Sequence, residues 1–241
     1  MKTLNQYIKE KLIINKDYVN AHTLTPESFD ELRKIIEDRY NKLGAGTEQN
    51  PIDFNDIDVS NFDSFYNYNK YQGIFEKTKF KYIDISDWDV SNVKSMRYMF
   101  AYCETLESSG DLSNWDVSSV ISMSYMFHGC KSFNQDLSKW DVSSVTNMHH
   151  MFCECENFNQ NLSKWDVSSV TDMGSMFYGC ESFNQDLSNW DVSSVKDMSF
   201  MFNYCEIFNC DLSAWDVTKV SNRIGMFDDC PIKDEYKPKF K

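Results

Sequence analysis

Apolar and polar residues follow one fixed order along most of the chain. In the copy that begins at Trp140, apolar Trp140 and Val142 flank polar Asp141, an alternation typical of a short strand. The apolar positions that follow step by three and four residues, as on one face of a helix. They are Val145, Met148, Met151, Phe152 and Cys155. Each unit is therefore predicted to be a strand, a turn, a short helix and a loop.

The same order returns every 25 residues, and its clearest markers are tryptophans: Trp115, Trp140, Trp165, Trp190 and Trp215. A fixed period of this length is typical of stacked supersecondary units. Neither the strand nor the helix of a unit buries its apolar side alone, so neighbouring units have to stack. We expect an α/β repeat solenoid, with a parallel sheet on one wall and short helices on the other. It should wind right-handed, as parallel crossovers almost always do.

The N-terminal part departs from this pattern. Residues 4–14 show the apolar spacing of a short helix, and residues 26–43 that of a longer one, with Thr25 as N-cap and Pro26 at its first position. The end of a solenoid exposes an apolar layer that needs a cap. We expect residues 1–50 to form this helical N-terminal cap, with a small separate adaptor as the alternative.

The repeats are expected over residues 51–232, where the first turn is degenerate and the last one decays. Residues 233–241 form a short basic tail that is expected to fray, as unanchored chain ends do.

The net charge narrows the choice of partner. The chain carries a formal net charge of −13. An acidic surface repels phosphate backbones and anionic lipid, so we expect neither nucleic acid nor a membrane surface as partner. No apolar run approaches the roughly 18 residues of a membrane span, and the first residues carry charges where a signal peptide has its apolar core. We expect a cytoplasmic chain, with a surface or virion-associated location as the alternative.

Most of the cysteines occupy one position of the unit: Cys103, Cys130, Cys155, Cys180, Cys205 and Cys230. Adjacent helices pack about 8–10 Å apart, whereas a disulfide needs α-carbons within about 7 Å, so we expect buried free thiols and no disulfide ladder. Free thiols are typical of a reducing compartment. Cys210 lies in the loop instead, in place of a glutamine, and is expected to be exposed. It is a candidate reactive thiol, although we favour an incidental cysteine without a role.

One cluster has the chemistry of metal ligands: His149, His150, Cys153 and Cys155. It occurs in a single copy and has no CxxC pair, so we expect no metal site there. The histidines have no fixed nucleophile partner, and no glycine-rich phosphate loop is present. We therefore expect no catalytic residues, no cofactor and no enzymatic activity.

An aspartate lies between the apolar Trp and Val of each unit. The column comprises Asp89, Asp116, Asp141, Asp166, Asp191 and Asp216. Like charges stacked at a strand spacing of about 4.8 Å repel one another unless something compensates. We favour local hydrogen bonds to each carboxylate from Ser or backbone N–H groups at the turn; the alternative is that the column binds calcium or a basic partner. We also expect an asparagine column to cap loop backbone between turns: Asn134, Asn159, Asn184 and Asn209.

The predicted helix wall varies from copy to copy, whereas the sheet wall does not. Its outward positions carry Tyr98, Tyr102, Tyr125, His128, His149, His150, Tyr178, Phe200 and Tyr204. Residues that differ among copies can encode a partner, and aromatic residues are enriched at interfaces. We hypothesise a protein-binding patch on this wall, beside the acidic face that carries the aspartate column. The alternative is ordinary surface variation.

The repeated residues resemble a known family, the BspA-like leucine-rich repeats of bacterial surface proteins, which also occur in mycoplasmas and bacteriophages. The matching pattern is Phe-Asn-x-Asp-Leu-Ser-x-Trp-Asp-Val-Ser-x-Val-x-x-Met-x-x-Met-Phe-x-x-Cys, over about residues 83–230. The resemblance implies a leucine-rich-repeat-like stack used for adhesion or protein binding. It implies no enzymatic activity and no fixed site residues.

Three functions from different classes are therefore considered. The first is a rigid, non-enzymatic module for protein–protein interaction, in the setting of a phage or mobile-element accessory protein. The second is a surface adhesin-like protein or a self-assembling structural component, a homo-oligomer through its solenoid ends. The third is an enzyme or metal-dependent regulator, for which only the cluster from His149 to Cys155 argues.

Overall fold

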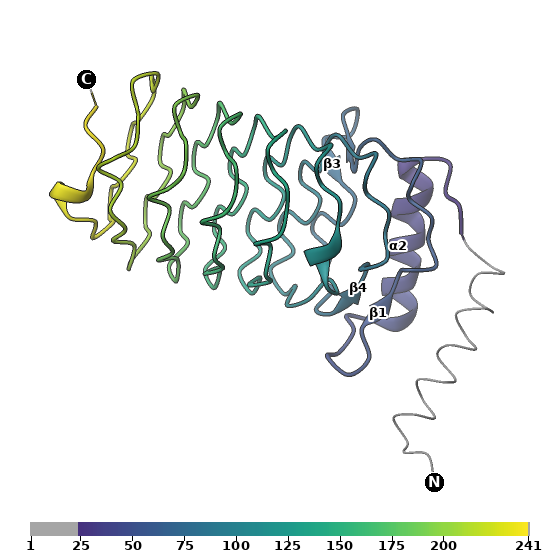
Figure 1. Cartoon of the computed structure of the whole chain (residues 1–241). Coiled ribbons are helices and arrows are strands. Elements are labelled where there is room, and N and C mark those ends of the chain that lie inside the picture. The colour runs from purple at the N-terminus through teal and green to yellow at the C-terminus, as the bar shows by residue number, and fades with distance from the viewer. Residues whose placement is uncertain (1–23, 241) are drawn as a thin grey trace, which may run out of the picture.

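The computed structural model describes residues 24–240, so the helix expected at residues 4–14 lies outside the described residues. Figure 1 shows successive coils of chain lying side by side, from helix α2 (Phe29–Leu43) at one end to the C-terminal residues at the other. One continuous cluster of buried side chains extends through this row, from Leu32 to Ile232. The core is therefore a long strip shared by all units.

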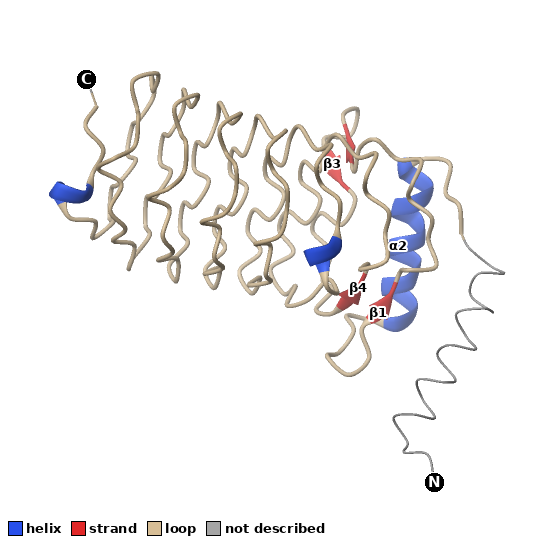
Figure 2. Ribbon diagram, in the orientation of Figure 1, coloured by secondary structure: helices blue, strands red, loops and turns tan. Residues whose placement is uncertain are grey.

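Regular elements within residues 24–240 are few, and all but one are short (Figure 2). Besides α2 they are β1 (Ile52–Asp53), β2 (Tyr66–Asn67), β3 (Gln72–Gly73), β4 (Ile83–Asp84), η1 (Leu112–Asn114) and η2 (Asp234–Tyr236). Strand β1 pairs with β4 in parallel, and β2 pairs with β3 antiparallel. Most of the described chain consists of turns and irregular backbone.

Helix α2 starts three residues later than expected, because Ser28 and not Thr25 is its N-cap. The Ser28 hydroxyl accepts a 3.2 Å hydrogen bond from the backbone N–H of Glu31. The helix ends at Gly44, whose φ of 79° suits glycine and whose N–H donates to the Tyr40 carbonyl. Leu32 and Ile36 are fully buried, so α2 packs on the first units of the row.

Successive units are joined by parallel backbone contacts at one recurring position. These bridges pair Ser95 with Ser122, Ser122 with Asn147, Asn147 with Asp172, Asp172 with Asp197 and Asp197 with Asn222. Beyond each bridge, every second N–H donates to the next unit: Met148 to the Asp172 carbonyl, His150 to Gly174, Phe152 to Met176 and Glu154 to Tyr178. The parallel contacts thus lie in the segment where helices were expected.

The short helices expected within the units are wrong for the described residues. The segment from Met148 to Cys155 consists of consecutive turns, in which each closing N–H bonds to the carbonyl three residues earlier. His150 and Glu154 have φ of 56° and 59°, in the left-handed region, which interrupts an α-helix. Turns of this kind also repeat about every three residues, so they bury the same apolar positions as a helix face.

The strand expected at Trp140–Val142 is also wrong, because this segment is irregular backbone. Trp140 and Val142 are nevertheless buried, and Asp141 is exposed, as the alternation predicted. The indole N–H of each tryptophan donates to a carbonyl of the preceding unit: Trp140 to Leu112 at 2.8 Å, and Trp165 to Leu137 at 3.0 Å. The tryptophans therefore join units by hydrogen bonds as well as by packing.

The cysteines behave as expected, for a different reason. All eight are free, and the first five of the repeated position are buried. Their thiols donate to carbonyls of the preceding unit, as Cys155 does to Phe127 and Cys180 to Phe152, both at 3.0 Å. The helix-packing argument does not apply, since no helices carry them. The thiols belong to the bonding between units.

The C-terminal tail is not frayed over its described residues. Ile232 is buried, and Tyr236 and Phe240 pack against the core cluster. The Leu212 N–H donates to the Tyr236 carbonyl at 2.8 Å. The Lys233 N–H donates to the Asn209 side chain, the last asparagine of its column. The tail therefore covers the last unit.

Candidate functional site

Three rings at one position of successive units form a stacked column, which we call the aromatic column: Tyr98, Tyr125 and His150. The Tyr98 and Tyr125 ring centroids are 4.4 Å apart, and those of Tyr125 and His150 are 4.6 Å apart, with nearly parallel planes. All three residues have a positive φ, between 53° and 60°. Left-handed backbone costs a non-glycine residue roughly 1–2 kcal/mol, so packing between the units has to offset this strain.

A groove of about 430 Å³ lies beside this column. The groove is lined by the predicted residues Tyr102, Tyr125, His128, His150, Tyr178 and Phe200, together with Cys153, Glu154 and Ser175. The structure thus brings six of the residues of the predicted wall to one place. Tyr98 lies next to the groove through its stacking on Tyr125.

His128 does not point outward as predicted. Only 7% of it is exposed, and its Nε2 lies 3.0 Å from the hydroxyl oxygen of Tyr102. Its ring packs edge-on against those of Tyr125 and His150. Burial lowers the pKa of His128, so the ring is neutral at physiological pH. His128 supports the groove from behind.

The two adjacent histidines differ in their surroundings. His149 Nδ1 lies 3.1 Å from a carboxylate oxygen of Asp172. The ring of His150 is half-buried, and burial together with the neighbouring His149 and His128 lowers its pKa to about 4. Its Nδ1 is buried and has no hydrogen-bond partner among the described residues. His150 therefore contributes a neutral ring face to the groove.

The cysteines near these histidines are in the core. Cys155 is fully buried and donates its thiol to the Phe127 carbonyl, and Cys153 is 3% exposed. Burial raises the pKa of the Cys153 thiol well above its ordinary value, which disfavours a thiolate. Over residues 24–240, no group of three or more His, Cys, Asp or Glu side chains is placed to hold a metal ion.

The aspartate column is engaged in local hydrogen bonds, as favoured. Asp141 Oδ1 accepts from the Ser143 N–H at 3.1 Å and from the Ser143 hydroxyl at 2.6 Å. The same pair of bonds forms at Asp116 and Asp166, whereas Asp191 accepts from a backbone N–H. These bonds lower the pKa of Asp141, with the serine hydroxyl as the main cause. None of these four aspartates lines the groove.

A second carboxylate column, missed in the sequence, lies five residues before the first. Asp111, Asp136, Asp186 and Asp211 each accept a bond from the backbone N–H two residues later. The asparagine column holds loop backbone between units, as predicted: Asn134 Oδ1 accepts from the Asn159 N–H, and Asn159 Oδ1 from the Asn184 N–H, both at 3.0 Å. These polar columns thus have structural partners within the repeat.

Sequence reasoning also missed residues that complete the groove. Ser175 occupies the position of the aromatic column in the next unit, and Glu154 is exposed at the groove edge. Arg97 lies over the ring of Tyr66, which stacks on Tyr98 and extends the column toward the N-terminus. A comparison of the copies at the position of Tyr125 would have singled out Ser175 as the small residue among rings.

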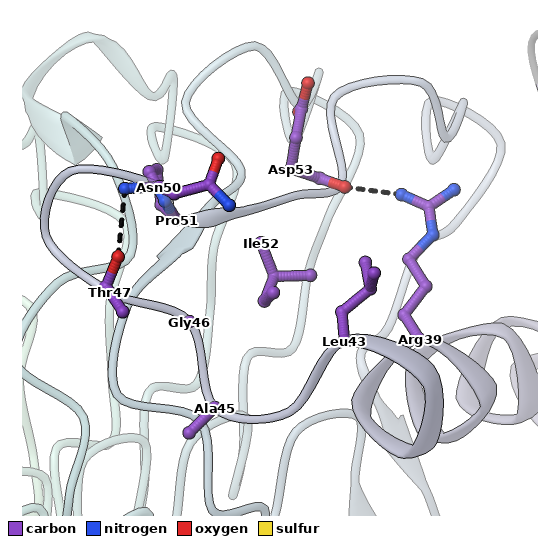
Figure 3. A pocket seen from close by; sticks show the side chains of 9 residues that line it. All are labelled: Arg39, Leu43, Ala45, Gly46, Thr47, Asn50, Pro51, Ile52 and Asp53. Atoms are coloured by element: carbon purple, nitrogen blue, oxygen red, sulfur yellow. Dashed lines mark hydrogen bonds between the residues drawn. The ribbon is translucent and has the colours of Figure 1, made fainter.

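A second cavity, of about 470 Å³, lies between the end of α2 and the loop that follows it (Figure 3). Arg39 is its cation, but that guanidinium already donates to the Asp53 carbonyl and to both carboxylate oxygens of Asp56. Gly46 closes the loop, because a Cβ there would lie 2.1 Å from the Tyr82 carbonyl oxygen. The polar groups of this cavity are thus committed to the fold, and the groove is the better candidate site.

Comparison with known proteins assigns the chain to a family. The model of the family described as "Mycoplasma protein of unknown function, DUF285" matches residues 69–170 and residues 135–237, which together are well over half of the chain. The chain belongs to the DUF285 family. The two DUF285 matches also agree with a chain built of repeats.

No curated protein matches the chain, and no solved structure matches it. The helices of the described residues do not include one with the length and apolar character needed to cross a membrane.

Proposed function

We propose that this DUF285 chain is a non-enzymatic protein-binding module, and that the groove beside the aromatic column is its binding surface. The observation that carries the proposal is the convergence of Tyr125, His150, Tyr178 and Phe200 on one groove. Aromatic side chains are costly to expose and are enriched at the energetic centres of interfaces. Phe200 is 39% exposed, so it offers apolar surface to a partner.

We infer that the row of units is a right-handed solenoid of the BspA-like leucine-rich-repeat type. The repeated residue pattern, the parallel bridges between successive units and the DUF285 membership support this inference. In such a stack each unit contacts only its neighbours, which leaves one long rigid surface for recognition. Residues that differ among units then determine what this surface binds.

The chemistry of the groove favours binding over catalysis. Its thiol, Cys153, has a raised pKa, and the pKa of its histidines His128 and His150 is lowered by burial. A buried thiol and two neutral imidazoles that stack on other rings make a poor nucleophile and base pair. The same side chains form a suitable wall for an apolar or aromatic group.

The setting we propose is a reducing compartment, as for a phage or mobile-element accessory protein. Eight free cysteines support it, since five thiols bond within the core as reduced groups. End-to-end self-assembly has less support, because Ile232, Tyr236 and Phe240 pack on the last unit.

Affinity capture from the native host with a groove variant tests the proposed function. Phe200→Ser combined with Tyr178→Ser removes two partly exposed rings of the groove without touching the stacked column. We expect partners captured by the wild-type chain to be lost with this variant, while the melting temperature changes little.

The matched control is Tyr71→Ser, which removes a ring that is 77% exposed and lies outside the groove. This variant should capture the same partners as the wild-type chain. Unchanged capture by the groove variant would contradict the proposal.

A further inference from the structure

The aromatic column is interrupted at one position. Tyr98, Tyr125 and His150 place a ring at this position in three successive units, and Phe200 does so again two units after His150. The intervening unit has Ser175, whose φ of 53° matches that of the ring-bearing residues. The backbone of this unit is therefore the same as elsewhere, and only the ring is missing.

A groove of about 430 Å³ lies where the ring is missing, and Ser175 at its base is 6% exposed. Adjacent units are about 4.8 Å apart where backbone pairs, so two steps separate the levels of His150 and Phe200 by about 10 Å. The stacked rings of the column and of its extension at Tyr66 have centroids 4.4 to 5.5 Å apart. One further ring between His150 and Phe200 would thus have a stacking distance to each neighbour that is normal for aromatic pairs.

The side chains around this space form a built slot. His150 is held by stacking on Tyr125 and by the edge of the His128 ring, so its exposed face is fixed. The ring of Phe200 lies against the next unit, as its position 2.5 Å from a Cβ built on Gly225 shows. Ser175 and the buried Cys153 line the same groove, which opens to solvent past Glu154.

We propose that this slot receives one aromatic side chain of a partner protein, inserted between His150 and Phe200 at the level of Ser175, with a Lys or Arg next to it that pairs with Glu154. The inserted ring completes the column. This deepens the proposed function and rests on it, since it names the kind of segment that the groove recognises.

The charge of the groove supports a basic neighbour for the inserted ring. Glu154 is exposed and has no ion pair among the described residues, and the chain as a whole carries a net charge of −13. Complementary charge steers the approach of a partner and fixes its register.

The inference is tested with two synthetic peptides, acetyl-Lys-Trp-Lys-amide and acetyl-Lys-Leu-Lys-amide, titrated into the full chain and followed by NMR or calorimetry. We expect the tryptophan peptide to bind and the leucine peptide to bind at least about tenfold more weakly, as expected from the loss of two stacking contacts. Equal binding of both peptides would overturn the proposal.

Ser175→Tyr is the decisive variant, since the equivalent residues Tyr98 and Tyr125 show that the backbone accepts tyrosine there. It fills the slot from within, so it should abolish binding of the tryptophan peptide, while the melting temperature of the chain stays the same or rises.

Phe200→Ala, at a partly exposed position, removes one wall of the slot. It should weaken binding of the tryptophan peptide about fivefold, and it tests the slot even if Ser175→Tyr does not fold. Glu154→Gln should weaken it about two- to threefold at low salt. Unchanged affinity in Phe200→Ala and in folded Ser175→Tyr would refute the slot.

The two proposals fail in different experiments. Peptide binding that depends on Ser175 and Phe200 supports the slot even if host capture finds no groove-dependent partner, in which case only the proposed function fails. Groove-dependent capture with no peptide preference for an aromatic residue refutes the slot alone.

Discussion

The indole Nε1 of Trp165 donates a 3.0 Å hydrogen bond to the backbone carbonyl of Leu137, one unit earlier in the row. That carbonyl also accepts the N–H of Trp140, so it holds one bond within its own unit and one between units. The same relationship recurs at Trp190 and Leu162, and at Trp215 and Leu187. The fixed spacing of the tryptophans thus reflects a repeated sequence pattern. It places the indole N–H of one unit next to the leucine carbonyl of the preceding unit.

Trp165→Phe should lower the free energy of unfolding by about 2–3 kcal/mol. The variant loses one inter-unit hydrogen bond, and the smaller ring leaves a cavity in a core position that is 3% exposed. Urea denaturation measures the change. Lys164→Ala, at the exposed neighbouring residue, is the control and should stay within about 0.5 kcal/mol of the wild-type value. A phenylalanine variant as stable as the wild type would show that the indole bond contributes nothing.

Asn159→Ala should destabilise the loop layer of the row by about 1 kcal/mol. Asn159 Oδ1 accepts from the Asn184 N–H at 3.0 Å and from Gln185 Nε2 at 2.8 Å, and alanine removes both bonds. The Asn184 amide proton should therefore exchange faster with solvent, which hydrogen exchange by NMR detects at that residue. Asn159→Asp keeps the acceptor oxygen and should leave the exchange of Asn184 slow. Equal exchange rates in the two variants would contradict this role of the side chain.

The stacking of units could be predicted because the repeat is visible in the sequence itself. Trp165 and its equivalents recur at one spacing, and apolar residues that recur in every unit have to bury one another. Burial of Val145 and Met148 followed from the same pattern. The local conformation did not follow, because apolar steps of three and four residues fit an α-helix and a run of turns equally well.

Left-handed residues decide between the two conformations, and they are hard to identify by type. A positive φ is uncommon for any residue but glycine, and neither Glu154 nor Tyr125 is of a type enriched there. A signal was nevertheless present: Gly129 and Gly179 occupy the position of Glu154, and Gly225 that of His150. Glycine at equivalent positions indicates a backbone that requires a positive φ.

The candidate site was predicted in composition but not in arrangement. Variation among copies identified Tyr125, His150 and Phe200, which do line one groove. The inward direction of His128 and the open position at Ser175 depend on the turn geometry, which the pattern of residue types does not encode. The candidate site therefore depends on the small side chain of Ser175 as well as on the rings of Tyr125, His150 and Phe200.

The His150 ring should make stability depend on pH. Its pKa is about 4 in the folded chain and 6.5 in an unfolded one, so the unfolded state binds more protons between these values. The free energy of unfolding therefore rises as the pH increases from 4 to 6.5. This contribution is lost as the pH falls from 6.5 to 4. We expect this contribution to be roughly 1–2 kcal/mol, since the ring is only partly buried.

His150→Tyr isolates that contribution, because it keeps a ring in the aromatic column and removes the titrating group. Urea unfolding at several pH values should give a flatter pH profile for the variant between pH 4 and 6.5. The variant keeps His128, His149 and Asp172, and because these neighbours shift the pKa of His150, the difference between the two profiles reports His150 together with its coupling to them. Parallel profiles for the two proteins would exclude His150 as the source.

Cys210 should be the first cysteine to react with a thiol reagent, but slowly at neutral pH. It is half-buried where Cys155 and Cys180 are fully buried. Burial raises its pKa, and the nearby Asp186 carboxylate, 3.4 Å from its Sγ, raises it further. Because the thiolate is the reactive form, Asp186→Asn should lower this pKa and speed modification of Cys210.

Mass spectrometry after timed labelling of the native chain locates the modified cysteine. Cys210→Ser is the control and should lose the product that forms first. A rate unaffected by Asp186→Asn would mean that access alone, and not the carboxylate, limits this thiol.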